Sequence, residues 1–488
     1  MDHIIIGGGM APNMLSTMLK FLEHKESLGL RSRALFYNVF RISRQYSSSG
    51  TSVQERRRGK FPSRTQHILG VMNFAITHTT APEILKSFMP VRKTPQIPSS
   101  RLSHLSAGLY YPPNSLKTRL CLRGRQMLYS YCTKHSIPHQ RLGKLIVGRE
   151  AQREYLANMH AKAQALRAPP HWDRSADPQV LPTEILSGDA ARKRVPALAR
   201  EITSALWSPS TGIVDSAALL NSLERGIRDA GGTIAYATRA VRIDIDATAD
   251  TERSCGGPGW VVQTVTGTEE NDEDAGADAT LARVLVNAAG LGATSVLNEI
   301  LPPARRVPIY FARGAYATYR GPGVRDIQHL VYPADEASAA KGASFHSLGT
   351  HLTLDMAGNV RFGPDIDWLS APNSAKHDEE VWEPHLSPDE ERARSMHASV
   401  LRYLPGVKPE GFQPDYAGIR PKLAPPGAPF QDFIVRTDYA EESKGRAPMI
   451  SLLGIESPGL TASLALAEMV VDDMLAKTNE KRIETEII

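Results

Sequence analysis

The chain reads HLSAGLYYPPNSLKTRLCLRGRQMLYSYC over residues 104–132, and this one span joins three unlike local signals. Small residues at 106–108 form a turn in which one backbone segment can approach another closely. Two tyrosines and two prolines at 110–113 form a rigid rim. An amphipathic helix is expected to begin after Asn114 and Ser115, because both are good N-cap residues. Such a turn can cradle a ligand, although it can equally be an ordinary connection to a helix.

A second glycine turn before a helix lies near the C-terminus, where residues 450–470 read ISLLGIESPGLTASLALAEMV. The pattern predicts a buried apolar strand, a turn that contains Gly454 and Gly459, and a helix that begins near Thr461 or Ser463. Backbone N–H groups and the dipole at a helix N-terminus favour an anion. A glycine-proline turn before a helix is also common as plain structure, so both interpretations stay open here.

Two further segments predict strands beside small-residue turns. Residues 231–246, GGTIAYATRAVRIDID, contain two short β-rich runs after a glycine turn. Residues 282–298, ARVLVNAAGLGATSVLN, read as a strand, a turn and a helix. Alanine and glycine in that turn leave room for a phosphate-like group to approach the backbone. The alternative is that both segments are core strands.

Length and composition restrict the classes of protein to which this chain can belong. A chain of 488 residues exceeds what one hydrophobic core usually holds, which predicts two domains or one elaborated domain. The net charge is +5, but the surplus lies between Arg31 and Arg64, which argues against a nucleic-acid-binding face on the folded body. The three cysteines have no metal-binding spacing and cannot form a disulfide framework, so we expect no metal site and a reducing compartment. No apolar run is long enough to span a bilayer, while peripheral contact with a membrane stays open.

The segments quoted above resemble L-2-hydroxyglutarate dehydrogenases, flavoproteins of the D-amino-acid-oxidase superfamily. The resemblance covers about residues 104–475 and is most specific in HLSAGLYYPP, SLKTRLC, GKLIVG, GIVD, NAAG, AGIRPKL and LLGIESPGLT. It implies FAD as the cofactor and an α/β fold. That fold would combine a discontinuous Rossmann-like FAD-binding domain with a substrate domain built on a mixed α+β sheet.

The resemblance and the alternation of strand and helix patterns predict how the chain is divided. We expect a truncated dinucleotide-binding strand and helix at 1–29, a basic presequence-like or disordered insertion at 30–98, the FAD-binding domain at 99–132, 215–300 and 415–475, the substrate domain at 133–214 and 301–414, and a tail at 476–488.

The resemblance also implies which residues contact FAD. The turn after the strand at 282–288 would pack against the pyrophosphate, the strand near 241 would meet the adenine, and the loop at 454–461 would lie beside the flavin ring. The expected contacts are Ser99, Ser100, Arg101, Ser103, Ala107, Gly108, Val241, Asn287, Ala288, Ala289, Gly290, Gly454, Gly459, Leu460 and Thr461.

The N-terminus departs from the dinucleotide-binding fingerprint GxGxxG. Gly7 and Gly9 take the first two glycine positions, but Pro12 takes the third, where it adds bulk and removes a donor. The acidic residue that binds the ribose usually follows about twenty residues on. Only Glu23 is available for that role, and it comes early. The sequence therefore predicts weak FAD binding.

Residues 30–50, LRSRALFYNVFRISRQYSSSG, are rich in arginine and serine and nearly free of acids. This composition resembles a mitochondrial presequence, which stands at the N-terminus of a protein, whereas the segment here is internal. We expect a mitochondrial location for a product that begins near Leu30 and a cytoplasmic one otherwise.

A further departure concerns chemistry. The family has a serine-serine-arginine-asparagine-serine run followed by a histidine, and this chain has SSRLSHLSAG from Ser99 onward. Leu102 stands in the asparagine position and His104 is displaced. We expect that His104 does not reach the flavin ring.

Residues 344–368 predict a hairpin, with strand HLTL, a turn at 357–359 and strand NVRFG. His351 and Thr353 should point to one face of the first strand. A histidine on a strand is more often structural than catalytic. The family resemblance favours catalysis, because this hairpin would face the flavin, and histidine can take the hydroxyl proton as hydride leaves carbon.

DYAGIRPKLAPP, residues 415–426, resembles the strand that amino-acid oxidases use to hold a substrate carboxylate. Arg420 would be the bidentate clamp, and Lys422 would help with a second carboxylate. An arginine before proline can instead be a surface charge at a strand end. Tyr316, Tyr332 and Tyr110 are further candidates for the substrate pocket, although buried tyrosines usually belong to the core.

Together these patterns predict an FAD-dependent enzyme that oxidises L-2-hydroxyglutarate, a small 2-hydroxy diacid, to 2-oxoglutarate by hydride transfer to the flavin. His351 and Arg420 would be its catalytic residues, and the sequence does not identify the electron acceptor. Two alternatives remain. One is a related flavin oxidase that acts on an amine or amino acid, and the other is a non-catalytic remnant with impaired FAD binding.

Overall fold

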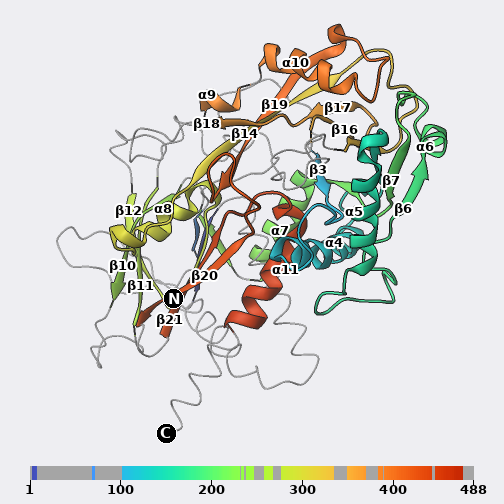
Figure 1. The fold of residues 1–488 in the computed structure, drawn as a ribbon. Helices are drawn as coiled ribbons and strands as arrows, with labels where there is room; N and C mark the ends of the chain where they lie inside the picture. Colours follow the sequence, from blue (N-terminus) through green and yellow to red (C-terminus); the bar gives the residue numbers. More distant parts are fainter. Residues whose placement is uncertain are drawn as a thin grey trace.

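The computed structural model describes residues 3–7, 69–71, 102–230, 232–235, 238–246, 258–266, 276–334, 349–369, 383–387, 389–441 and 446–475. Two large sheets, two small ones and a set of helices make up this part of the chain (Figure 1). Its α-helices are α4 (Leu116–Lys134), α5 (Arg153–Ala165), α6 (Gly188–Arg194), α7 (Ser216–Asp229), α8 (Ala293–Asn298), α9 (Glu383–Leu386), α10 (Glu390–Val400) and α11 (Gly459–Met469).

The first large sheet is predominantly parallel. Among the described residues its six strands follow the order β20–β21–β13–β1–β2–β9, and only β20 runs antiparallel to its neighbour. Val286 and Ile450 on its central strands are buried, as expected for parallel strands covered on both faces. This is the predicted Rossmann-like sheet. Its strands are β1 (His3–Gly7), β2 (Leu69–Val71), β9 (Thr233–Ala235), β13 (Val284–Ala288), β20 (Ile434–Glu441) and β21 (Arg446–Leu453).

One strand of this sheet lies inside the range 30–98, for which an insertion is predicted. Leu69–Val71 pairs with β1 on one side and with β9 on the other. At these residues the predicted insertion is therefore a sheet strand instead. A strand of three residues is too short to leave a readable hydrophobic period in the sequence.

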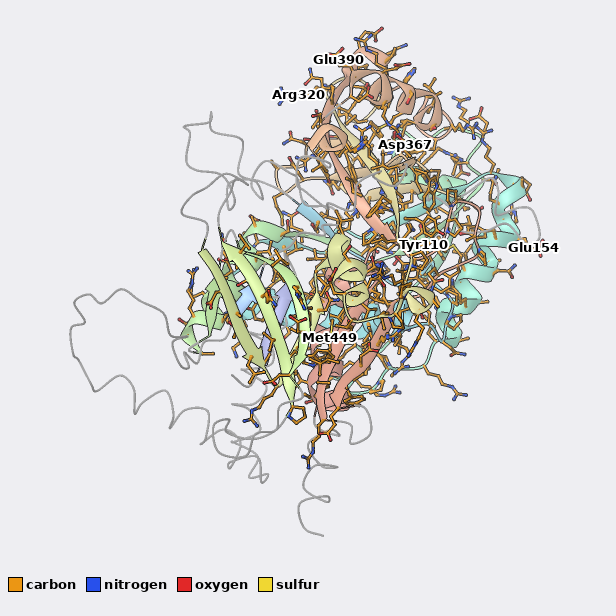
Figure 2. The ribbon with its side chains drawn as sticks, turned by 90° about the vertical axis from the view of Figure 1, so that its left-hand side faces the viewer. Tyr110, Glu154, Arg320, Asp367, Glu390 and Met449 are labelled. Carbon is orange, nitrogen blue, oxygen red and sulfur yellow. The ribbon has the colours of Figure 1, made fainter. Side chains whose placement is uncertain are left out.

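A small antiparallel sheet flanks the first one. It contains β10 (Thr238–Asp246), β11 (Gly259–Thr266) and β12 (Gly276–Ala282). Trp260 on β11 is buried, and its indole N–H donates to the carbonyl of Ala447, 2.9 Å away on β21. Figure 2 shows this sheet beside Met449, which belongs to the same hydrophobic cluster.

The second large sheet is mixed, as predicted for the substrate domain. In the part of the chain that the structure describes, it has nine strands in the order β18–β14–β17–β16–β15–β5–β7–β6, with β19 on the other side of β14. β15 and β5 run parallel, and the other pairs are antiparallel. The strands are β5 (Lys144–Gly148), β6 (Glu184–Ser187), β7 (Ser204–Ser208), β14 (Tyr310–Tyr319), β15 (Leu330–Pro333), β16 (His351–Leu354), β17 (Val360–Gly363), β18 (Asp367–Leu369) and β19 (Phe412–Lys422).

Helices α4 and α11 cross in close contact (Figure 1). Gly124 on α4 permits this approach, because a Cβ atom there would lie 2.1 Å from the carbonyl oxygen of Thr461. The Ser115 hydroxyl caps α4 by accepting from the Thr118 N–H, as the sequence predicts. α11 begins at Gly459, which is earlier than Thr461 or Ser463, because Pro458 serves as its N-cap residue.

A second small sheet lies next to α11. Its strands are β3 (Leu102–Leu105), β8 (Gly212–Asp215) and β4 (His139–Gln140), with β8 in the centre. β3 carries Ser103 and His104 and leads directly into the small-residue turn at 106–108. None of the helices in the described ranges is both long enough and apolar enough to cross a membrane.

Candidate functional site

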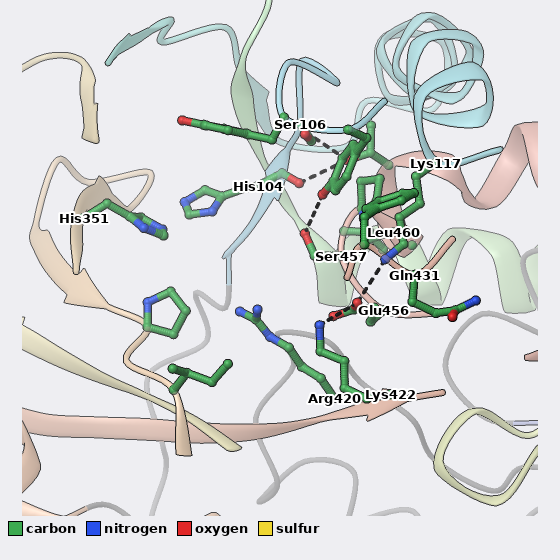
Figure 3. A pocket seen from close by; sticks show the side chains of 18 of the residues that line it. His104, Ser106, Lys117, His351, Arg420, Lys422, Gln431, Glu456, Ser457 and Leu460 are labelled. Carbon is green, nitrogen blue, oxygen red and sulfur yellow. Dashed lines mark hydrogen bonds and ion pairs between the residues drawn. The ribbon is translucent and has the colours of Figure 1, made fainter. Parts of the chain in front are cut away.

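A cavity lies where the loop before α11, the strand β3 and three strands of the mixed sheet meet (Figure 3). β16, β15 and β19 contribute His351, Tyr332 and Arg420 to its wall, and β3 contributes His104. Residues that are hundreds of positions apart in the sequence therefore face one space. The lining also includes Ser103, Tyr110, Lys117, Lys144, Tyr316, Lys422, Glu456, Gly459, Leu460 and Thr461.

The cavity lies next to the carboxyl ends of the parallel strands. Gly7 at the end of β1 is the register partner of Ala288 at the end of β13, and β21 leads into the loop at 454–458. Gly290 and Gly454, in the loops that follow β13 and β21, have φ values of +58° and +64°. Ligands of open α/β sheets bind beyond such strand ends. The strand ends and their glycine loops therefore fit a dinucleotide cofactor.

Asn287 does not present its side chain to a ligand, contrary to the predicted contact. It is fully buried, and its Nδ2 donates to the Ala293 carbonyl at 2.8 Å and to Ser451 Oγ at 3.3 Å. Its Oδ1 accepts from the Ala289 N–H at 3.3 Å. The side chain thus fixes the turn between β13 and α8. Any contact with the cofactor has to come from the backbone of this turn, where Ala289 is also buried.

The predicted turn at 106–108 is tied to the start of α11. Thr461 Oγ1 accepts from the Ser106 N–H at 2.9 Å and donates to the His104 carbonyl at 3.3 Å. Gly108 has a φ of +85°, which favours glycine. Ala107 is buried and its carbonyl accepts from Arg125, so the Ala107 side chain has no access to a ligand. The structure therefore brings together the two glycine turns that the sequence singles out.

Two histidines and a tyrosine form the part of the cavity suited to proton transfer. The His351 ring stacks on Tyr332 with centroids 3.8 Å apart, and His104 lies 6.0 Å from His351 (Figure 3). His351 Nδ1 lies 3.1 Å from the Gly349 carbonyl. Because a carbonyl oxygen only accepts, Nδ1 carries the hydrogen, and Nε2 is then the basic nitrogen of the neutral ring.

His104 lines the cavity despite its displacement in the sequence. Its Nδ1 lies 3.4 Å from the Tyr332 hydroxyl oxygen. Burial, together with the charges of Lys144 and Arg361, lowers the pKa of His104 to about 4. His104 is therefore a neutral ring near pH 7 and can donate or accept a hydrogen bond without carrying charge.

Arg420 enters the cavity from β19, as predicted. Its guanidinium points toward His104 and not toward Glu456 (Figure 3). Burial raises the pKa of Tyr316, while the charge of Arg420 and a hydrogen bond to Arg420 oppose that rise. Within the described residues no carboxylate forms an ion pair with Arg420. An arginine fork that has no protein carboxylate is suited to bind one from a ligand.

Lys422 does not provide the free charge that the sequence predicts for a second carboxylate. Its Nζ lies 2.7 Å from Glu456 Oε1, and Lys117 Nζ lies 2.9 Å from the same oxygen (Figure 3). Burial alone would raise the pKa of Glu456, but the charges of Lys117, Lys422 and Arg420 outweigh it and lower that pKa to about 2. The one carboxylate thus pairs with both lysines, which fixes Lys422 against the loop before α11 and leaves the three groups with a net positive charge.

We expect Glu456→Gln to destabilise the protein strongly, because it leaves two buried ammonium groups without a counter-ion. The cost should be about 3–5 kcal/mol in the free energy of unfolding, as for other broken buried pairs. Chemical denaturation at pH 7 measures it. Since the folded pKa of about 2 lies below the ordinary value, the wild-type advantage exists above pH ~4.3 and disappears as the pH falls toward 2.

Glu390→Gln provides the matched control, because Glu390 pairs with Arg394 on the surface, with side chains 76% and 71% exposed. That change should cost less than about 1 kcal/mol. An equal shift of both variants would contradict the role given to Glu456.

Lys144 is a cavity residue that the sequence analysis missed. It begins β5, is only 3% exposed, and its Nζ lies 4.5 Å from the ring centroids of both Tyr110 and Tyr332. Burial lowers the pKa of Lys144 to about 7. The signal was a lysine at the head of the apolar run KLIVG, where charge is unexpected.

Several predicted contacts cannot be placed. Gly9, Glu23, Ser99, Ser100 and Arg101 lie outside the described residues. Val241 is described and lies on β10, 42% exposed, at an irregularity in the pairing with β11. Its predicted contact with adenine remains a proposal.

Comparison with known proteins agrees with the fold. The sequence profile of the FAD dependent oxidoreductase family (DAO) matches residues 99–473. Among solved structures, the FAD-bound L-α-glycerophosphate oxidase of Mycoplasma pneumoniae matches 96% of this chain and 94% of its own, with a TM-score of 0.62 and 16% identity. A glycine oxidase from Geobacillus kaustophilus gives a TM-score of 0.57 at 14% identity, covering 96% and 93% of the two chains. The chain therefore belongs to the FAD-dependent oxidoreductases of the DAO family.

Curated relatives show to which group within the DAO family the chain belongs. The chain is 31% identical to the mitochondrial L-2-hydroxyglutarate dehydrogenase of Arabidopsis thaliana over 78% of this chain and 76% of that protein. It is 28% identical to the mitochondrial L-2-hydroxyglutarate dehydrogenase of Pongo abelii, over 54% of this chain and only 55% of that protein. Within the DAO family, the chain belongs with the L-2-hydroxyglutarate dehydrogenases.

Proposed function

We propose that this protein oxidises L-2-hydroxyglutarate to 2-oxoglutarate. The observation that carries the proposal is one cavity in which Arg420, with no carboxylate partner among the described residues, faces two histidines. A 2-hydroxy acid needs both features, namely a cation for its C1 carboxylate and a base for its C2 hydroxyl. The names of the relatives from Arabidopsis thaliana and Pongo abelii support the same substrate.

Arg420 would hold the C1 carboxylate with two parallel N–H donors, which fixes the position of the adjacent C2 atom. His351 Nε2 would then accept the proton of the C2 hydroxyl. As the O–H bond breaks, its electron pair forms the C=O bond, and the C2–H bond breaks with hydride leaving C2. When bound, FAD supplies the acceptor for that hydride. The Tyr332 ring, stacked on His351, holds the imidazole in orientation.

The residues that would hold FAD are the strand ends and glycine loops described above. Gly7 and Ala288 end neighbouring strands, Gly290 and Gly454 lie in the loops that follow β13 and β21, and Gly459 lines the cavity. The N-terminus of α11 faces the cavity and would favour negative charge there.

A direct test compares substrates with the purified full-length protein. Because the sequence predicts weak FAD binding, FAD is added, and we expect the flavin absorbance to bleach with L-2-hydroxyglutarate and not with glycine, sarcosine or D-alanine. The preference follows because the cavity offers cations for carboxylates and a base for a hydroxyl. Bleaching by the amines alone would establish an amine oxidase instead, and a colourless protein that takes up no added FAD would indicate a remnant.

We also propose a mitochondrial location, which the names of the Arabidopsis and Pongo relatives support. Import of two tagged chains into isolated mitochondria tests this, one that begins at Met1 and one that begins at Leu30. Exclusion of the chain that begins at Leu30 would contradict it.

A further inference from the structure

Two cations line the cavity without a carboxylate partner in the described part of the chain. They are Arg420 on β19 and Lys144 on β5. The other two cavity lysines, Lys117 and Lys422, share Glu456. The proposed substrate carries two carboxylates, and Arg420 accounts for one of them.

The ammonium group of Lys144 is in an unusual environment for a charged group. Lys144 is 3% exposed, and its Nζ lies 4.5 Å from the centroid of each of the Tyr110 and Tyr332 rings. A cation–π contact gives about 0.5–2 kcal/mol, which is less than the several kcal/mol that burial of an unpaired ion costs. An anion from solution would remove that penalty.

Lys144 and Arg420 act on the same region from two sides. The Lys144 ammonium lies over the Tyr332 ring. Burial raises the pKa of Tyr332, and the charge of Arg420 opposes this rise, which places the guanidinium within electrostatic range of the Tyr332 hydroxyl. Tyr332 also stacks on His351. The proposed base therefore lies between strands that carry two cations with no ion-paired carboxylate in the described residues.

We propose that Lys144 binds the distal carboxylate of the substrate, so that the cavity selects diacids over monoacids. Arg420 holds the C1 carboxylate at the other end. This inference rests on the proposed oxidation of a 2-hydroxy acid, and it identifies the residue that recognises the carboxylate at the far end of the substrate. Lys144 takes the role that the sequence predicts for Lys422, because Lys422 is held in an ion pair with Glu456.

The ionisation of Lys144 gives the proposal a pH signature. Burial lowers the pKa of Lys144 to about 7 and that of His104 on β3 to about 4, while burial raises the pKa of Cys121 on α4 to about 11. Burial also raises the pKa values of Tyr110 and Tyr332. Among these five groups, Lys144 alone changes charge between pH 6 and 9. His351 also faces this group of residues, because its ring stacks on Tyr332. Diacid binding should weaken above pH 7 as the ammonium deprotonates.

The test compares L-2-hydroxyglutarate with L-2-hydroxyvalerate, which has the same five-carbon chain but a terminal methyl group. In Lys144→Met we expect KM for the diacid to rise about 10- to 100-fold, with the rate of flavin reduction at saturation nearly unchanged. KM for the monoacid should stay the same or fall. Lys162→Met is the matched control, because Lys162 is a largely buried lysine outside the cavity lining, with Nζ 3.4 Å from the Tyr111 carbonyl.

A second measurement uses the unmodified protein, in case Lys144→Met does not fold. Glutarate and pentanoate are titrated against the holoenzyme between pH 6 and 9, with the flavin spectrum as the readout. Glutarate affinity should fall above pH 7 while pentanoate affinity stays nearly constant.

The outcomes separate the two proposals. No turnover of L-2-hydroxyglutarate by the wild type refutes the proposed function itself. Turnover with unchanged discrimination in Lys144→Met, or with a slower maximal reduction and unchanged KM, refutes only the role of Lys144 as the distal carboxylate site. Parallel pH profiles for glutarate and pentanoate refute it as well.

Discussion

Arg420→Lys should raise the KM for L-2-hydroxyglutarate by a factor that corresponds to about 2–4 kcal/mol. Lysine keeps the positive charge but loses the planar fork, so it cannot hold a carboxylate with two parallel hydrogen bonds. FAD content should be unchanged, because Arg420 lies on β19 in the wall formed by the mixed sheet and not at the ends of the parallel strands. Rapid mixing of enzyme and substrate, followed by flavin bleaching, measures the apparent dissociation constant and the reduction rate separately.

Arg436→Lys is the matched control for this experiment. Arg436 is also an arginine on a strand, β20, and its guanidinium lies 2.6 Å from an Asp438 carboxylate oxygen. Arg436 is not among the residues that line the cavity. It should leave both constants near their wild-type values. If Arg420→Lys bound substrate as tightly as the wild type, Arg420 would be a structural residue of the β19 strand end, and the hydroxy-acid assignment would lose its main physical support.

His351→Gln should lower the rate of flavin reduction at saturating substrate by roughly a hundredfold or more, with substrate affinity little changed. Glutamine keeps an N–H donor for the Gly349 carbonyl but has no basic nitrogen to take the hydroxyl proton. Because the interaction that it removes belongs to the transition state, the loss should appear in the maximal rate and not in the dissociation constant. The same rapid-mixing measurement reports it.

His329→Gln tests whether loss of any hydrogen-bonded histidine has this effect. His329 Nδ1 lies 2.6 Å from the Leu142 carbonyl, so its local bonding resembles that of His351, yet it does not line the cavity. Flavin in the His329→Gln variant should be reduced at the wild-type rate. Should His104→Gln slow reduction while His351→Gln does not, the proton acceptor would be His104, which faces the same space.

The local elements of the fold were largely predictable. Ser115 caps a long amphipathic helix, the glycine turn at 357–359 connects β16 to β17, and the apolar run that ends at Leu453 is a strand. Each depends on interactions between residues close in the sequence, which leave a readable pattern. The strand Leu69–Val71 was not predictable, because the strands with which it pairs, β1 and β9, are far away in the chain.

The candidate site was predictable only in part. The sequence pointed to His351, Arg420 and the turns at 106–108 and 454–461, and all four border one cavity. It assigned free charge to Lys422, because nothing in the strand around Lys422 reveals that Glu456 lies 2.7 Å away. It also passed over Lys144, because a lysine that heads an apolar run looks like the exposed end of a strand.

The sequence by itself determined the family, the Rossmann-like and mixed-sheet architecture, and the residue types available for binding a hydroxy acid. Only the tertiary structure decided which charges remain available to a ligand. Glu456 is ion-paired with both Lys117 and Lys422, whereas Arg420 and Lys144 form no ion pair with a carboxylate in the described residues. The physical reason is that a charge acts through space, and its strength in a cavity depends on burial and on the nearest opposite charge. Neither quantity is local in sequence, so both emerge only when the strands and loops are brought together.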